Sequence, residues 1–203
     1  MVNQNQKLFF VIAGFSSIVI FFSCLPVPVL AQKLSFSPSR HTIIGVPQIH
    51  QGRNECGPVS VAMVLNYWGV KKNKDKLKEP LRWDSEKGVH PINMIRFSYN
   101  AGYKYDSPEE GSIERIIEHI VQGRPVIVRQ WLNYDAKNKA DIGHYRVVIG
   151  YDHERQEIYM RDPAIRTGRF SSLSYKEFLE LWDLSNHAKT SSKNWMLVLI
   201  PEK

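Results

Sequence analysis

The segment from Gln51 to Gly69 constrains the fold most, because it carries the signals for the start, the buried face and the end of one helix. Pro58 suits the first turn of a helix, where its missing N–H is no loss, and Gly69 suits the position after the last turn. Apolar residues recur at helical spacing on one face: Val61, Val64, Leu65 and Trp68. The sequence therefore predicts a helix that begins near Cys56 and buries one face in a core.

Cys56 stands where a reactive sulfur atom is favoured. The positive end of the helix dipole and the unpaired N–H groups of the first turn both stabilise a thiolate over a thiol. Cys24 is expected to leave with an N-terminal signal, so Cys56 would be the sole cysteine of the mature chain and would have no disulfide partner. A small buried hydrophobic side chain is the alternative interpretation of Cys56.

Residues 1–31 have the pattern of a signal peptide. Lys7 precedes an apolar run over residues 8–22, and a small-residue cleavage pattern ends at Ala31. The alternatives are a retained anchor, for which this run is short of the roughly 20 residues needed to cross a bilayer, and a lipoprotein modified at Cys24. We expect export to the periplasm or the extracellular space, without stable membrane insertion after cleavage.

The charge of the chain is moderately basic and spread out. There are 27 basic and 20 acidic side chains, and removal of residues 1–31 takes away one lysine, so 26 against 20 leaves +6. One run is dense in lysine, with Asp75 and Glu79 interleaved: Lys71, Lys72, Lys74, Lys76 and Lys78. We interpret it as a solvated face, and the alternative is weak attraction to an anionic polymer. The alternation of basic and aromatic residues typical of nucleic-acid binding is missing, so we expect no nucleic-acid partner.

The order of the predicted elements is that of an α+β fold. Residues 32–45 are expected to form a polar tether, and residues 46–203 one domain. Helices are expected over residues 56–68, 92–101, 113–121 and 175–182, and strands over 126–131, 145–151, 156–161 and 195–200. In the second helix Ile92, Ile95 and Tyr99 share one face. Helices come first and a mostly antiparallel sheet follows, so we expect N-terminal helices packed on that sheet.

The strands over 145–151 and 156–161 bring an imidazole and a carboxylate together. If their hairpin is centred near His153 and Glu154, His144 lies opposite Pro163 and beside Asp162. A carboxylate there would hold the ring of His144 in one tautomer and leave its other nitrogen for a proton carried by sulfur. The sequence thus predicts a nucleophile, a base and an orienting group.

A cysteine nucleophile also needs a donor for the oxyanion. Gln51 can offer its side-chain amide, and the backbone N–H of Cys56 can supply a second donor. Gln48 is the competing candidate, which we interpret as a solvated loop residue.

These motifs resemble those of the peptidase C39-like cysteine peptidases, a branch of the papain-like clan. The resemblance runs in order over residues 46–163: Val46-Pro47, Gln51, Cys56 to Gly69, Gly123 to Val128, His144 to Asp152, and Asp162-Pro163. It implies a papain-like fold, with Gln51 in the oxyanion hole, Cys56 as nucleophile, His144 as base and Asp162 as its partner. In the family the glutamine commonly lies six residues before the cysteine, whereas Gln51 lies five before Cys56.

The resemblance implies a cysteine peptidase that hydrolyses a peptide or amide bond of a peptide or protein substrate through a thioester. Founding members are cytoplasmic domains of transporters that cut leader peptides after a double glycine, whereas this chain is short and is expected to be exported. The alternatives are acyl transfer of the phytochelatin-synthase type and a papain-like domain that binds peptides or wall polymers without turnover. No cofactor is expected, and no metal, because the remaining histidines lack ligand spacing: His50, His90, His119, His153 and His187.

Overall fold

A computed structural model of the chain describes residues 37–108, 110–135, 143–187 and 192–201. The expected signal peptide lies outside the described residues, as do residues 32–36 of the expected tether. Among the helices within these ranges, none is long and apolar enough to cross a membrane.

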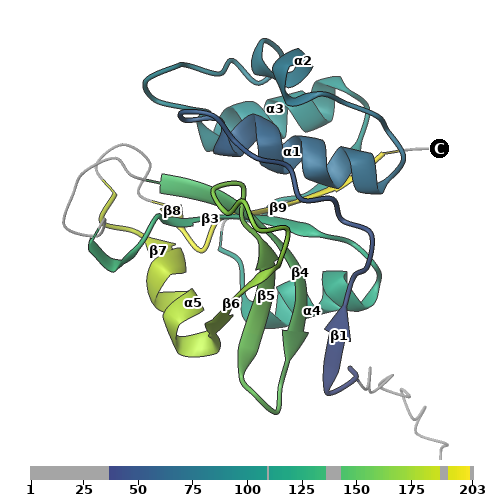
Figure 1. The fold of residues 1–203 in the computed structure, drawn as a ribbon, viewed down its shortest axis with the longest axis vertical. Coiled ribbons are helices and arrows are strands. Elements are labelled where there is room, and N and C mark those ends of the chain that lie inside the picture. The colour runs from purple at the N-terminus through teal and green to yellow at the C-terminus, as the bar shows by residue number, and fades with distance from the viewer. Residues whose placement is uncertain (1–36, 109, 136–142, 188–191, 202–203) are drawn as a thin grey trace, which may run out of the picture. The chain divides into compact units, whose positions relative to one another are not determined.

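The helices are α1 (Cys56–Tyr67), α2 (Lys74–Lys78), α3 (Pro91–Asn100), α4 (Ile113–Val121) and α5 (Tyr175–Trp182). The strands are β1 (Arg40–Thr42), β2 (Lys104–Asp106), β3 (Val126–Trp131), β4 (Gly143–Asp152), β5 (Glu157–Arg161), β6 (Ser171–Ser174), β7 (Asp183–Leu184), β8 (Ser192–Lys193) and β9 (Met196–Ile200). Figure 1 shows α1, α2 and α3 gathered above the strands, whereas α4 and α5 lie at the level of the strands, near β4 and β6 respectively. The α+β class predicted from the sequence is confirmed.

A seven-stranded sheet lies below α1, α2 and α3 (Figure 1). Its strand order is β2-β9-β3-β4-β5-β6, and β1 pairs with residues 150–152 of β4, beyond the stretch that pairs with β3. Every pairing of the described strands is antiparallel. β7 and β8 form a separate two-stranded sheet.

Helix α1 is buried nearly all round rather than on one face. Its residues from Cys56 to Leu65 are all buried, whereas Trp68 is only partly buried, and the helix packs against β4. A helix this enclosed holds its first residue in a fixed place against the sheet.

The helix that was expected over residues 92–101 forms as α3, but its core face differs from the one that the apolar spacing suggests. Met94 and Phe97 are buried, whereas Ile92 is half exposed and Tyr99 is 73% exposed. His90 caps the helix, since its Nδ1 atom accepts a hydrogen bond from the N–H of Ile92 at 3.4 Å.

The other predicted elements form close to the expected places. Ser112 caps α4 by accepting a hydrogen bond from the N–H of Arg115, and Ser174 caps α5 in a capping box with Glu177. The closing strand runs from Met196 rather than from residue 195.

The expected polar tether of residues 32–45 needs a correction in its described part. Arg40–Thr42 form β1, and Ile43 is buried and donates its N–H to the carbonyl of Ile149 at 2.7 Å. The free edge of β4 offers unpaired backbone groups there, which a polar strand can satisfy as well as an apolar one.

The hairpin of β4 and β5 forms with a shifted register. The paired residues include Val147 with Arg161 and Asp152 with Glu157, and a bulge lies between Val148 and Gly150. An added residue on one strand changes the pairing by one position, so the expected pairing of His144 with Pro163 is off by about one residue. Despite the bulge, His144 lies beside Asp162.

Candidate active site

Cys56 is the first residue of α1 and lies against the start of β4. The residue is only 8% exposed, and hydrogen bonding from the backbone N–H groups of Tyr145 and Gly57 contributes to a lowered pKa of its thiol. A Cβ atom at Gly57 would come within 2.9 Å of the side chain of Val89. Glycine at position 57 therefore lets the Gly88-Val89 segment approach the start of the helix.

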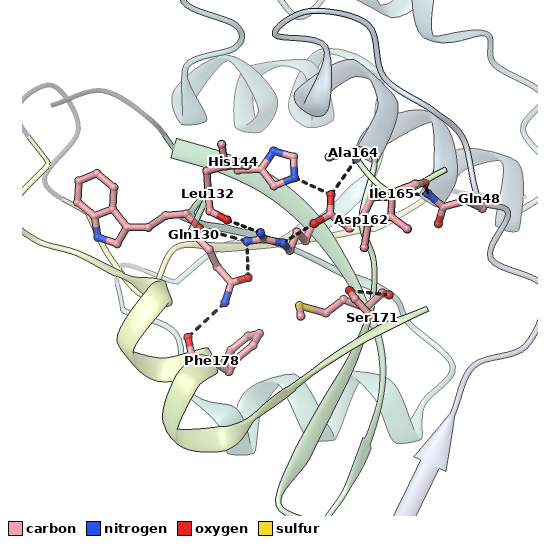
Figure 2. A network of polar contacts seen from close by, with 12 residues as sticks. Gln48, Gln130, Leu132, His144, Asp162, Ala164, Ile165, Ser171 and Phe178 are labelled. Carbon is pink, nitrogen blue, oxygen red and sulfur yellow. Dashed lines mark hydrogen bonds and ion pairs between the residues drawn. The ribbon is translucent and has the colours of Figure 1, made fainter. Parts of the chain in front are cut away.

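His144 lies between Cys56 and Asp162. Its Nε2 atom is 2.7 Å from Oδ1 of Asp162, and Figure 2 shows the ring pointing to that carboxylate. The ring also lies beside Cys56, since hydrogen bonding between the two side chains lowers the pKa of the thiol and raises that of the imidazole. Because Nε2 is used by Asp162, the atom that serves Cys56 is Nδ1. The structure thus brings together three of the four residues predicted from the sequence.

Burial and hydrogen bonding act in opposite directions on the pKa values of these groups. Burial by itself raises the pKa of Cys56, but the hydrogen bond and the positive charge of His144 outweigh burial, so the pKa lies below its usual value. Burial by itself lowers the pKa of His144, but hydrogen bonds with Asp162 and Cys56 raise it above its usual value. Both shifts favour a thiolate beside an imidazolium.

Arg146 is a member of this cluster that the sequence analysis missed. Its Nε atom donates to Oδ2 of Asp162 at 2.8 Å, and the N–H of Ala164 donates to Oδ1 at 2.8 Å (Figure 2). Burial alone would raise the pKa of Asp162, but hydrogen bonding to His144 and the charges of His144 and Arg146 keep it well below its usual range. Asp162 is therefore held as a carboxylate in one orientation.

The remaining donors of Arg146 are also used. They reach Oε1 of Gln130 at 3.1 Å, the carbonyl of Trp131 at 3.2 Å and the carbonyl of Leu132 at 2.8 Å. Gln130 in turn donates to the carbonyl of Phe178 in α5 (Figure 2). Because side chains alternate between the two faces of a strand, the sequence of β4 could have placed Arg146 on the same face as His144. The partners of Arg146 lie in other segments of the chain, so the sequence did not predict its contacts.

The two glutamines have different surroundings from those expected. Gln48 is not a solvated loop residue, because its Nε2 atom donates to the carbonyls of Asp162 at 2.7 Å and Ile165 at 3.0 Å (Figure 2). Gln51 donates its backbone N–H to the carbonyl of Pro163 at 3.1 Å. Its Oε1 atom is buried and has no hydrogen-bond partner among the described residues. Both contacts hold the segment before Cys56 against the segment that follows Asp162.

Glu55 was also missed, and it changes the interpretation of the lysine run. Its buried carboxylate accepts a hydrogen bond from the N–H of Gly52 at 2.7 Å and forms ion pairs with Lys74 and, at 2.6 Å, with Lys78. Burial alone would raise the pKa of Glu55, but these lysines and Gly52 lower it to about 2. Two lysines of a run that we interpreted as a solvated face therefore fasten the loop that leads into Cys56.

Two cavities adjoin the cluster. One, of about 360 Å³, is lined by Cys56, Arg53, Gly143 and Tyr145, and a second, of about 260 Å³, extends to His90 and His187. Residues 86–89 and Arg129 line both cavities, so the two cavities adjoin and together are called the cleft. Within the described ranges, no group of three or more His, Cys, Asp or Glu side chains could hold a metal ion.

Comparisons with known proteins support a peptidase fold. The sequence model of the Peptidase_C39 like family matches residues 26–190. No curated protein sequence matches the chain significantly.

Three solved structures are similar to this one. A C39-like peptidase from Bacillus anthracis has a TM-score of 0.63 and 19% identity, covering 81% of this chain and 98% of that chain. A double glycine motif protease from an AMS/PCAT transporter, in complex with the leader peptide, has a TM-score of 0.54 and 19% identity. The match covers 80% of this chain and 95% of that chain. Xylellain, a cysteine protease from Xylella fastidiosa, has a TM-score of 0.51 and 10% identity. The match covers 82% of this chain and 87% of that chain. At these identities the likeness establishes a shared papain-like fold.

Proposed function

Since the chain belongs to the Peptidase_C39 like family and is a cysteine peptidase, we propose that it hydrolyses peptide bonds with Cys56, His144 and Asp162 as its catalytic triad. The observation that carries this proposal is the hydrogen bond of His144 with the Asp162 carboxylate at 2.7 Å, beside a Cys56 thiol whose pKa is lowered by hydrogen bonding to His144 and by its charge. It supplies a thiolate, an acid for the leaving amine and a group that stabilises the imidazolium.

The reaction follows from these roles. The thiolate of Cys56 attacks the carbonyl carbon, and the oxyanion accepts hydrogen bonds from the Cys56 N–H and the Gln51 side-chain amide. The imidazolium of His144 then gives its proton to the leaving amine as the C–N bond breaks, which leaves a thioester. Water gives a proton to the neutral His144 and attacks the thioester, and the thiolate leaves as the acid product forms. Asp162 stays ionised throughout.

The substrate is a peptide or protein segment. One structure of similar fold, the double glycine motif protease, is in complex with a leader peptide, and a cavity of about 360 Å³ lies beside Cys56 here. Acyl transfer to an amine and binding without turnover are outcomes that the following experiment separates.

Alkylation by iodoacetamide and peptide turnover test the triad. In the wild type Cys56 should react rapidly with iodoacetamide at low pH, and His144→Ala should lose this rapid reaction. His50 is exposed, so His50→Ala is the matched control and should keep the rapid reaction. A thiol in the wild type that reacts slowly and is indifferent to His144→Ala would indicate a binding domain and contradict the proposal. Turnover of a mixed peptide library should disappear in Cys56→Ser, and products formed with added amines would reveal acyl transfer.

We also infer that the enzyme acts after export. The apolar run over residues 8–22 and the small residues ending at Ala31 support this, and a solitary Cys56 keeps its thiol in an oxidising compartment. The mature protein isolated from outside the cytoplasm should begin at Gln32. An uncleaved chain found in the cytoplasm would contradict this inference.

A further inference from the structure

Arg129 places a buried positive charge in the cleft beside Cys56. It lies in β3, its residue is only 6% exposed, and it lines both cavities of the cleft. In the antiparallel register it pairs with Tyr145, so the two side chains share one face of the sheet. The hydroxyl group of Tyr145 donates a hydrogen bond to the carbonyl of Val89 at 2.9 Å. The face of the sheet that carries Arg129 and Tyr145 therefore lies against residues 86–89, which also line the cleft.

The position of the guanidinium group is well defined. Its Nη2 atom is 3.2 Å from Nε2 of His187, and its Cζ atom lies 6.0 Å from the ring centre of Tyr145. A Cβ atom at Gly143 would overlap the guanidinium group. Glycine next to His144 therefore gives Arg129 its place at the floor of the cleft.

The other Arg, Lys, Asp and Glu side chains that the structure describes along the cleft are exposed: Arg53, Arg82, Asp84, Glu86 and Lys87. Glu86 and Lys87 are exposed and opposite in sign, as are Arg82 and Asp84. Oδ1 of Asp84 accepts hydrogen bonds from the N–H groups of Glu86 and Lys87 within its own turn, each at 2.8 Å. Exposed charges are screened by water and salt, whereas a buried charge is screened much less. The charge of the buried Arg129 is therefore screened less than the charges of these exposed residues.

The neighbouring His90 responds to this charge. Its pKa is lowered first by burial and then by the positive charges of Arg129 and Arg96. The influence of Arg129 thus extends from the cavity at Cys56 into the second cavity, where His90 is part of the wall.

We propose that the Arg129 guanidinium binds a carboxylate of the substrate, so that the enzyme prefers substrates with an acidic group close to the scissile bond. The inference rests on the proposed peptidase function and names its substrate class. A guanidinium group matches a carboxylate in charge and in donor geometry. The carboxylate belongs either to an Asp or Glu side chain or to the C-terminus of a short peptide.

The first test needs no turnover. Iodoacetate and iodoacetamide alkylate the same thiol and differ in charge, and mass spectrometry assigns the modification to Cys56 in the full chain. The ratio of the iodoacetate rate to the iodoacetamide rate should fall about tenfold in Arg129→Gln, in line with a lost charge-assisted hydrogen bond. The ratio should stay at the wild-type value in Arg155→Gln, whose side chain is 73% exposed on the turn after β4. An unchanged ratio in Arg129→Gln would overturn the inference.

The second test uses the wild type, so that it decides the question even if Arg129→Gln does not fold. Peptide pairs with Glu or Gln at each position around the scissile bond, each with a free or an amidated C-terminus, separate the two sources of the carboxylate. One carboxylate should raise kcat/KM by about tenfold or more over its neutral counterpart, and this ratio should shrink in Arg129→Gln. Equal kcat/KM values throughout would overturn the inference. Should no peptide be cleaved, the peptidase proposal fails and the alkylation ratio alone decides the role of Arg129.

Discussion

The ion pairs of Glu55 predict a pH-dependent stability that can be worked out from the structure. The pKa of Glu55 falls from 4.5 to about 2 in the folded protein. At about 1.36 kcal/mol per pKa unit, this shift corresponds to about 3 kcal/mol of stability at neutral pH. The side chains of Lys74 and Lys78 are about one quarter exposed, and solvent screening reduces the expected loss in Glu55→Gln to about 2 kcal/mol.

The sign of the pH dependence follows from the direction of the shift. A carboxyl whose folded pKa is lowered stabilises the protein fully above its unfolded pKa, here 4.5, and the stabilisation is lost as the pH falls toward 2. Urea unfolding should therefore show a gap of about 2 kcal/mol between wild type and Glu55→Gln at pH 7. This gap should shrink as the pH falls from about 5 to about 3.

Asp75→Asn provides the matched control. Asp75 also pairs with Lys78, at 2.7 Å, but its side chain is 60% exposed, so its removal should cost much less and should not reproduce the trend with pH. A gap between wild type and Glu55→Gln that stays constant from pH 7 to pH 3 would refute the reasoning. So would an equal loss in the two variants.

Other variants probe the cluster around His144. Arg146→Met should destabilise the protein by about 3 kcal/mol or more in urea unfolding, because the carboxylate of Asp162 stays buried without the guanidinium group of Arg146. The double variant Arg146→Met with Asp162→Asn should recover part of this stability. No recovery would contradict the pairing of Arg146 with Asp162. Asp162→Asn should lower kcat/KM at least about a hundredfold. It should also move the alkaline limb of the pH profile of kcat/KM to lower pH, because the carboxylate of Asp162 raises the pKa of His144. An unmoved alkaline limb would contradict the role of Asp162 in holding the imidazolium. Gly143→Ala should lower the free energy of unfolding by about 1–3 kcal/mol, because the added methyl group overpacks against Arg129. It should also lower the ratio of the iodoacetate rate to the iodoacetamide rate, as Arg129→Gln does. A wild-type ratio of these rates would show that the guanidinium group of Arg129 keeps its position.

The sequence by itself predicted the longer helices and strands, though not β1, and the main candidates of the site. Helix signals around Pro58 and Ser112 and the apolar strands depend on neighbours a few residues away, so local patterns predict them. The hairpin of β4 and β5 is also local, which is why His144 and Asp162 could be placed side by side despite the bulge. The core face of α3 could not be chosen, because Ile92 and Tyr99 offer large apolar side-chain surfaces, as Met94 and Phe97 do, and only the neighbouring elements decide which pair is covered.

The tertiary structure alone decided which charged side chains serve the site. Lys74 meets Glu55 from a separate helix, Arg146 meets the carbonyls of β3 and the loop that follows, and Arg129 reaches the cleft because Gly143 lacks a side chain. A lysine or an arginine has the same appearance in a sequence whether it is solvated or buried against a carboxylate. Its energy depends on burial and on partners brought near by the fold, which no local pattern records.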